Sequence, residues 1–201
     1  MIDLYYAPTG NGYRACIILR EAELEFRPHR IHFTAKPEEL FKLNPSGTIP
    51  VIRDSEGLDG RPLVLSQSGA ILEYVALKTG RFWPADLGRR AMALQWFAHA
   101  LSDVSASSSA FHMSQNDVPE RSEANTRFWE QWLLNMLGAC DRQLEGRDYL
   151  AEEVSLADFA LYPAVMRRLG VIERHGGMVH LNRWLERMSA RPGVAAGMAM
   201  K

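Results

Sequence analysis

NPSGTIPVI, at residues 44–52, joins a turn-forming tetrapeptide to a short apolar run. A second apolar run follows at 63–65, and the intervening DSEGLDGRP at 54–62 is rich in turn-forming residues. This pattern predicts an antiparallel β-hairpin. Directly after it, SQSGAILEY at 66–74 places a serine before apolar residues at helical spacing, which predicts a helix that Gly80 ends.

Upstream of the hairpin, the pattern predicts a strand, a helix, a second strand and a short helix. The apolar run at 2–7 ends in a cluster of proline and glycine, and apolar residues then recur at helical spacing over 15–22. The second strand covers about 26–33, where Pro28 predicts an edge position because proline has no N–H to donate to a neighbouring strand. With a short helix at 37–43, the element order through the first helix after the hairpin is βαβαββα.

The second half of the chain shows no further strand signal. Apolar residues follow helical spacing at 91–101, 128–144 and 181–188. We therefore expect two domains, an α/β domain at 1–80 and an all-α domain at 88–201.

VSLADF, at 154–159, has the pattern of a helix capping box. Ser155 is placed to cap the helix, Asp158 is placed to reach back to the backbone of the cap residue, and Val154 can pack on Phe159. We interpret this segment as a folding device rather than a catalytic site.

Composition and charge narrow the classes of function. The chain has 201 residues, 23 Lys and Arg against 24 Asp and Glu, and a net charge of −1, which predicts no attraction to nucleic acid or to an anionic membrane. No apolar run reaches the roughly 18 residues of a membrane span, and Asp3 stands where a signal peptide would be basic. We expect a cytoplasmic protein. Cys16 and Cys140 form no metal-binding or dithiol motif, and we expect both to be buried.

The motifs NPSGTIPVI, SQSGAILEY and SLAD (155–158) occur in an order that resembles cytosolic glutathione transferases over essentially the whole chain. This resemblance implies a thioredoxin-like domain that binds glutathione and a helical domain that contributes the pocket for the second substrate. It also implies a homodimer, glutathione as co-substrate without any metal, and a small electrophile or disulfide as the other substrate, with a role in detoxification. No nucleic acid or membrane partner is implied.

The same resemblance assigns the residues that bind glutathione. In the family, the proline matching Pro50 is cis, and the backbone of the residue matching Ile49 pairs with the cysteinyl unit like an added strand. Gln67 and Ser68 match the helix start that receives the γ-glutamyl carboxylate, where helix amides favour an anion. The family commonly has lysine where this chain has Thr48 and glutamate where it has Gln67. We expect these departures to weaken binding.

The opening MIDLYYAPTGNG resembles bacterial nu-class enzymes, which favour glutathione-dependent disulfide reduction. The resemblance assigns Thr9 and Asn11 to the glutathione sulfur. Donors at that sulfur would favour the thiolate over a thiol whose ordinary pKa is about 8.5. Tyr5 and Tyr6 are rival candidates, although tyrosines in a short strand commonly serve in packing. In the helical half, SDVS at 102–105 is closer to a beta-class pattern, and its aspartate, Asp103, is either a contact to a partner subunit's glutathione or a solvated carboxylate.

Two other readings of the sequence remain open. GNGYRA at 10–15 fits the glycine-rich fingerprint of dinucleotide-binding folds, but residues 30–33 lack the acidic residue that the fingerprint needs. A non-enzymatic member that uses this fold for binding or scaffolding is the second alternative, because a fold does not imply an activity.

Overall fold

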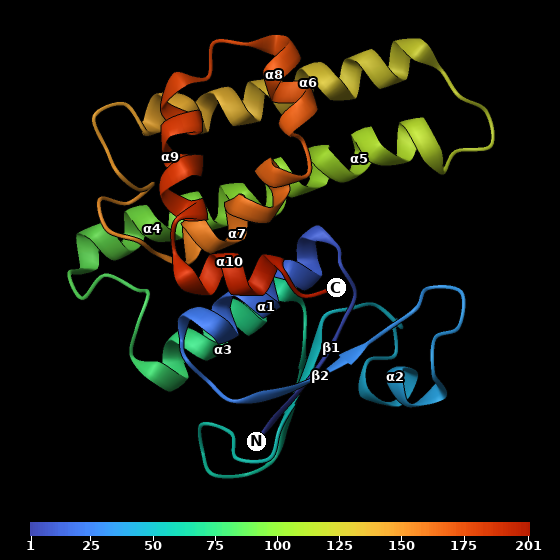
Figure 1. Ribbon diagram of the computed structural model, residues 1–201, viewed down its shortest axis with the longest axis vertical. Coiled ribbons are helices and arrows are strands. Elements are labelled where there is room, and N and C mark those ends of the chain that lie inside the picture. The colour runs from blue at the N-terminus through green and yellow to red at the C-terminus, as the bar shows by residue number, and fades with distance from the viewer. The chain divides into compact units, whose positions relative to one another are not determined.

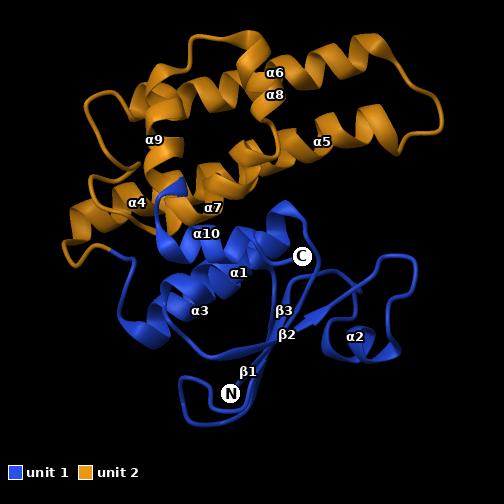
Figure 2. Ribbon diagram, viewed as in Figure 1, with its two compact units in different colours: residues 1–83, 189–201 blue, residues 84–188 orange.

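The computed structural model describes residues 1–201, which divide into two compact units. Unit 1 comprises residues 1–83 and 189–201, and unit 2 comprises residues 84–188 (Figure 2). The chain passes from unit 1 to unit 2 after Trp83. The last thirteen residues belong to unit 1, whereas the sequence pattern had assigned them to the helical domain of 88–201.

Unit 1 is built on a four-stranded mixed sheet with the strand order β2-β1-β3-β4 (Figure 1). The strands are β1 (Ile2–Tyr6), β2 (Phe26–Arg30), β3 (Val51–Asp54) and β4 (Leu63–Ser66). β2 runs parallel to β1, whereas β3 runs antiparallel to both β1 and β4. The predicted order βαβαββα is confirmed, and the strand that contains Pro28 lies at the edge as expected. A mixed sheet of this kind is not the doubly wound parallel sheet that a dinucleotide fingerprint requires.

The four helices of unit 1 are α1 (Gly10–Glu21), α2 (Glu38–Leu43), α3 (Ser68–Thr79) and α10 (Pro192–Met198). α1 and α3 lie together on one side of the sheet and α2 lies on the other (Figure 1). Successive strand residues point to opposite faces, so Tyr5 and Val51 pack with Leu40 of α2. Their neighbours Leu4 and Ile52 are buried completely.

The C-terminal helix α10 packs closely along α1. A Cβ atom on Gly197 would come within 2.6 Å of the Ile17 backbone, so glycine is needed at this crossing. At the start of α10, the buried carboxylate of Glu21 accepts from Arg191 Nη2 at 2.6 Å and from the backbone N–H of Val194 at 3.1 Å. These long-range contacts explain why the chain end joins unit 1.

Unit 2 is all helical, and its elements are α4 (Leu87–His99), the π-helical turn η1 (Ala100–Val104), α5 (Ser105–Asn116), α6 (Glu123–Gln143), α7 (Leu156–Met166), α8 (Leu169–His175) and α9 (Val179–Ser189). α4 begins four residues before the predicted start, because the Asp86 side chain accepts from the Arg89 N–H and caps the helix there. None of the helices combines the length and apolarity needed to cross a membrane.

The capping box of α7 and the two cysteines match the sequence expectations. Asp158, which is fully buried, accepts from the Ser155 N–H at 2.9 Å and from the Ser155 hydroxyl at 3.2 Å. Cys16 and Cys140 are both buried, and burial raises the pKa of each thiol to about 12. Neither thiol is therefore suited to act as a nucleophile near neutral pH.

Candidate functional site

The first turn of α1 carries the residues assigned to the thiol. Thr9 is the N-cap, and its Oγ1 accepts from the Gly12 N–H at 3.1 Å. The turn is tight, because a Cβ atom on Gly12 would lie 2.0 Å from the Ala7 carbonyl oxygen. A hydroxyl that accepts from the backbone still has its own proton to donate. Thr9 therefore caps α1 and keeps one donor for a ligand.

Asn11 lies in the first helical turn rather than in a preceding loop, and it is exposed. Its Oδ1 accepts from Arg14 Nη1 at 2.8 Å and lies 3.4 Å from the Ser68 hydroxyl, which donates to it. Arg14 Nη1 also lies 3.3 Å from Ser68 Oγ. Side chains from the N-terminal turns of α1 and α3 thus converge on one point, although they are more than fifty residues apart in sequence.

Arg14 is a buried cation, with 3% of its surface exposed. Burial lowers the pKa of its guanidinium to about 10, so the group stays protonated at neutral pH. Arg14 was not expected at the site from the sequence, because an arginine on a helix is usually a surface residue. The only sequence signal was its place in the helical turn that follows Asn11.

The rival tyrosines are engaged in packing. Tyr5 stacks on His29 with ring centroids 4.7 Å apart, and its hydroxyl donates to Glu39 at 3.3 Å. The Tyr6 hydroxyl donates to the Lys201 carbonyl at 3.1 Å. Burial raises the pKa of both phenols. Each hydroxyl therefore already has a partner within the protein.

The loop at 44–48 is organised by the buried side chain of Asn44. Its Nδ2 donates to the Thr48 carbonyl at 2.9 Å and to Thr48 Oγ1 at 3.0 Å, and its Oδ1 accepts from the Ser46 hydroxyl at 3.0 Å. Thr48 Oγ1 also lies 2.8 Å from Ser46 Oγ, so the Thr48 hydroxyl forms its hydrogen bonds within the loop. Lys36 Nζ donates to the Gly47 carbonyl at 3.0 Å and brings a positive charge to this loop. Lys36 was not expected at this site, because its contact with Gly47 spans eleven residues that include the short helix α2.

After this loop, the Ile49–Pro50 peptide bond is cis, as the resemblance implied. Pairing with β4 begins one residue later, where Val51 faces Ser66. The structure shows no hydrogen-bond partner for either the N–H or the C=O of Ile49. The backbone at this position is thus open to an extended ligand that pairs with it.

Gln67, the N-cap of α3, has a positive φ of 73°. Such a backbone conformation is uncommon for a residue with a side chain and is often found at functional sites. It is followed by Ser68 and by the first amides of a twelve-residue helix, a region that favours a carboxylate. Gln67 and Ser68 therefore lie at the start of a helix, an environment that favours an anion.

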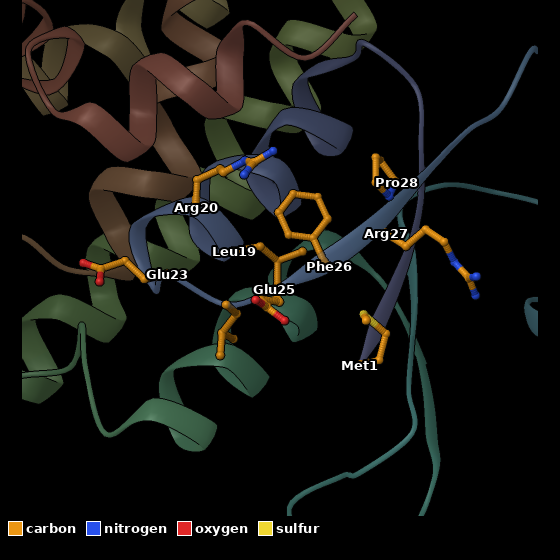
Figure 3. Close-up of a pocket in the computed structure, with 9 residues that line it drawn as sticks. Met1, Leu19, Arg20, Glu23, Glu25, Phe26, Arg27 and Pro28 are labelled. Carbon is orange, nitrogen blue, oxygen red and sulfur yellow. The ribbon is translucent and has the colours of Figure 1, made fainter.

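Of the assigned residues, Thr9, Asn11 and Ser68 lie at neighbouring helix N-termini, whereas Thr48, Ile49 and Pro50 belong to the loop before β3. A separate groove of about 670 Å³ runs along edge strand β2 and the end of α1 (Figure 3). None of the assigned residues lines that groove, and Arg20 covers the Phe26 ring there. No three His, Cys, Asp or Glu side chains come together in a geometry that could hold a metal ion.

Family models match both halves of the chain. Residues 11–78 match the glutathione S-transferase N-terminal domain, and residues 105–192 match the glutathione S-transferase C-terminal domain. The disulfide-bond oxidoreductase YfcG of Escherichia coli K12 is 31% identical over 209 residues, which cover 100% of this chain and 94% of that protein.

Solved structures with bound glutathione are also similar. A glutathione transferase from Pseudomonas putida, solved with one glutathione disulfide per subunit, has a TM-score of 0.91 at 29% identity and covers 99% of this chain and 91% of its own. One from Burkholderia graminis, with two glutathione molecules per subunit, has a TM-score of 0.89 at 31% identity, covering 99% and 88%. The family models and the solved structures thus agree on the fold.

Proposed function

Because this chain belongs to the glutathione S-transferase family, we propose that it binds glutathione in unit 1 and activates its thiol for reaction with small disulfides. Thr9 and Asn11 hold the sulfur, Ile49 pairs with the cysteinyl backbone, and the γ-glutamyl carboxylate lies at Gln67 and Ser68. Thr48 and Pro50 shape the loop that carries Ile49.

The proposed reaction is thiol–disulfide exchange. The bound thiolate attacks one sulfur of the disulfide, a new S–S bond forms, and the other sulfur leaves as a thiolate that takes a proton from water. A second glutathione thiolate then attacks the mixed disulfide, which releases glutathione disulfide and the second thiol. Two glutathione molecules supply the two electrons. The buried cysteines take no part.

The observation that carries this proposal is the pair of open donors at the start of α1. Thr9 keeps its hydroxyl proton, and Asn11 presents its amide nitrogen while its oxygen is engaged. Donors to a thiolate lower its pKa, and each unit of lowering corresponds to about 1.4 kcal/mol of differential stabilisation. One or two hydrogen bonds to a charged sulfur are of that size.

The decisive experiment compares two substrates with glutathione as co-substrate. We expect faster turnover of hydroxyethyl disulfide than of a chloronitroarene. A dominant rate on the chloronitroarene would instead assign conjugation, the second candidate, which is favoured by the relatives named glutathione transferases. Binding of glutathione with neither reaction would identify a non-enzymatic binding module.

The residues are tested by Thr9→Ala and Asn11→Ala. Each variant should lose about tenfold or more of the disulfide reductase rate near pH 7, because each removes one donor that favours the thiolate. Leu58→Ala, at an exposed residue in the turn between β3 and β4 and outside the site, is the matched control and should keep the wild-type rate. Wild-type rates in both site variants would remove Thr9 and Asn11 from the mechanism.

We also propose that the protein is a homodimer that acts in the cytoplasm, where glutathione is kept reduced. Several large apolar side chains of unit 2 are exposed, namely Leu87, Met92 and Leu94 on α4 and Phe128 and Trp132 on α6. Side chains of this kind are common at subunit interfaces. Sedimentation at micromolar concentration should give twice the chain mass, and a single-chain mass would exclude the dimer.

A further inference from the structure

Arg14 connects the two helix N-termini that the proposed function uses. Its guanidinium donates to Asn11 and contacts Ser68 from beneath the surface, and its side chain is almost completely buried. A charged group is costly to bury, so its retention at this point calls for a role.

The first consequence concerns the orientation of the Asn11 amide. Its Oδ1 receives both Arg14 Nη1 and the Ser68 hydroxyl. A flipped amide would set its NH2 group against the guanidinium N–H, with a donor facing a donor. Asn11 Nδ2 is therefore fixed as the outward atom, and the structure shows no protein partner for it.

The second consequence concerns charge. A guanidinium joined at 2.8 Å to the amide oxygen polarises the amide and makes the outward N–H a stronger donor. The positive charge itself also lies behind the amide, on the side away from any bound sulfur. Both effects favour a thiolate over a neutral thiol at Asn11 Nδ2.

We propose that Arg14 is a positioning residue for the glutathione thiol, which fixes the Asn11 amide and supplies a buried positive charge that lowers the thiol pKa. This inference rests on the proposed function, because it requires glutathione to bind in unit 1. It adds a residue that makes no contact with the substrate and acts through Asn11.

The test measures the pKa of bound glutathione from the ultraviolet absorbance of its thiolate, with affinity for S-methylglutathione measured separately. Arg14→Met removes both the donor and the charge and should raise the bound thiol pKa by about one unit, a tenfold change in ionisation. Arg14→Gln keeps a donor for Asn11 without the charge and should raise the pKa of the bound thiol by less than Arg14→Met does. Arg14→Lys should stay close to wild type.

Arg168→Met is the matched control, since Arg168 Nε also donates to a serine, Ser108, at 2.9 Å within unit 2. This variant should lose stability without changing the thiol pKa. All Arg14 variants that fold should bind S-methylglutathione within about threefold of wild type, because this ligand has no thiol to ionise.

Two different failures are distinguishable. If the wild-type protein does not bind S-methylglutathione, the proposed function fails and this inference fails with it. If the wild type binds it and ionises glutathione, but Arg14→Met and Arg14→Gln keep the wild-type thiol pKa, only the role of Arg14 is overturned. Should Arg14→Met not fold, Arg14→Gln decides the question.

Discussion

The N-termini of α1 and α7 contain similar residues, but they differ in whether their polar side chains find all of their hydrogen-bond partners within the protein. Both helices start at a hydroxyl residue, Thr9 or Ser155, and both have a buried charged side chain nearby, Arg14 or Asp158. At α7 the Ser155 hydroxyl and the Asp158 carboxylate form their hydrogen bonds with other groups of the protein. At α1 the Thr9 hydroxyl and the exposed Asn11 amide each keep a donor that no protein group accepts. The same type of helix N-cap therefore stabilises the fold at α7 and leaves hydrogen-bond donors available to a ligand at α1.

The difference lies in what surrounds each charge. The Asp158 carboxylate accepts from the Leu150 N–H at 3.1 Å, from Trp184 Nε1 at 2.9 Å and from two groups of Ser155. Its burial raises the pKa of the carboxyl group, and these hydrogen bonds oppose that rise. Arg14 instead donates to Asn11, whose other side is exposed.

The largest effect should come from Asp158→Ala. Removal of this carboxylate leaves several buried donors without an acceptor, and we expect a loss of about 3 to 5 kcal/mol in the free energy of unfolding. Chemical denaturation measures this loss. Asp117→Ala, at an exposed carboxylate in unit 2, should change stability by less than about 0.5 kcal/mol. An equal loss in the free energy of unfolding for the two variants would contradict the view that the hydrogen bonds of Asp158 stabilise the start of α7.

A matched pair of cap variants tests the comparison directly. Thr9→Ala and Ser155→Ala should each lower the free energy of unfolding by about 0.5 to 2 kcal/mol, because each removes an N-cap side chain. Only Thr9→Ala should slow the glutathione-dependent reaction when both proteins are assayed well below their melting temperatures. A comparable slowing in Ser155→Ala would mean that helix stability, rather than an open donor, controls the rate.

The smallest expected change in the free energy of unfolding concerns Asp3, a buried carboxylate in β1 of unit 1. It accepts from Arg27 at 2.6 Å, from His29 at 2.8 Å and from Arg53 at 3.0 Å. Burial alone would raise its pKa, but these donors outweigh burial and hold the pKa of Asp3 at about 2. The lowered pKa means that Asp3 stabilises the fold above pH of about 4, its pKa when unfolded, and that this contribution is lost as the pH falls towards 2.

We therefore expect Asp3→Asn to lower the free energy of unfolding by about 1 kcal/mol at pH 7 and by progressively less below pH 4. The effect is modest because Arg27 and Arg53, the partners of Asp3, are solvent-exposed. Denaturation of both proteins between pH 2 and 7 measures this dependence. A difference that stays constant across the whole range would show that the charge of Asp3 is not the cause.

The sequence predicted helices and strands well where local rules apply. Gly80 ends α3 in the left-handed conformation, Ser155 and Asp158 form the capping box, and the proline-containing strand lies at the sheet edge. It was less accurate at boundaries. The second strand ends at Arg30 rather than near Phe33, and the hairpin strand begins at Val51 rather than at Ile49.

For the candidate site, the sequence named individual residues but not the contacts that connect them. Thr9 and Asn11 were named from the opening motif, and Ser68 from the helix start. The link between them through Arg14 was missed, as was the contact of Lys36 with the Gly47 carbonyl. Thr48, which was assigned to the glutathione site in place of the family's usual lysine, forms hydrogen bonds through its hydroxyl within its own loop.

The sequence by itself determined the order of the strands and helices over residues 1–80, the glycine that ends α3 and the capping box that begins α7. These features depend on groups three or four residues apart, so their chemistry can be read along the chain. The tertiary structure alone decided that Arg14 is buried between Asn11 and Ser68, and that the chain end packs on α1 through Glu21 and Arg191. Contacts over 54 or 170 residues depend on how whole elements pack, and no local pattern encodes them.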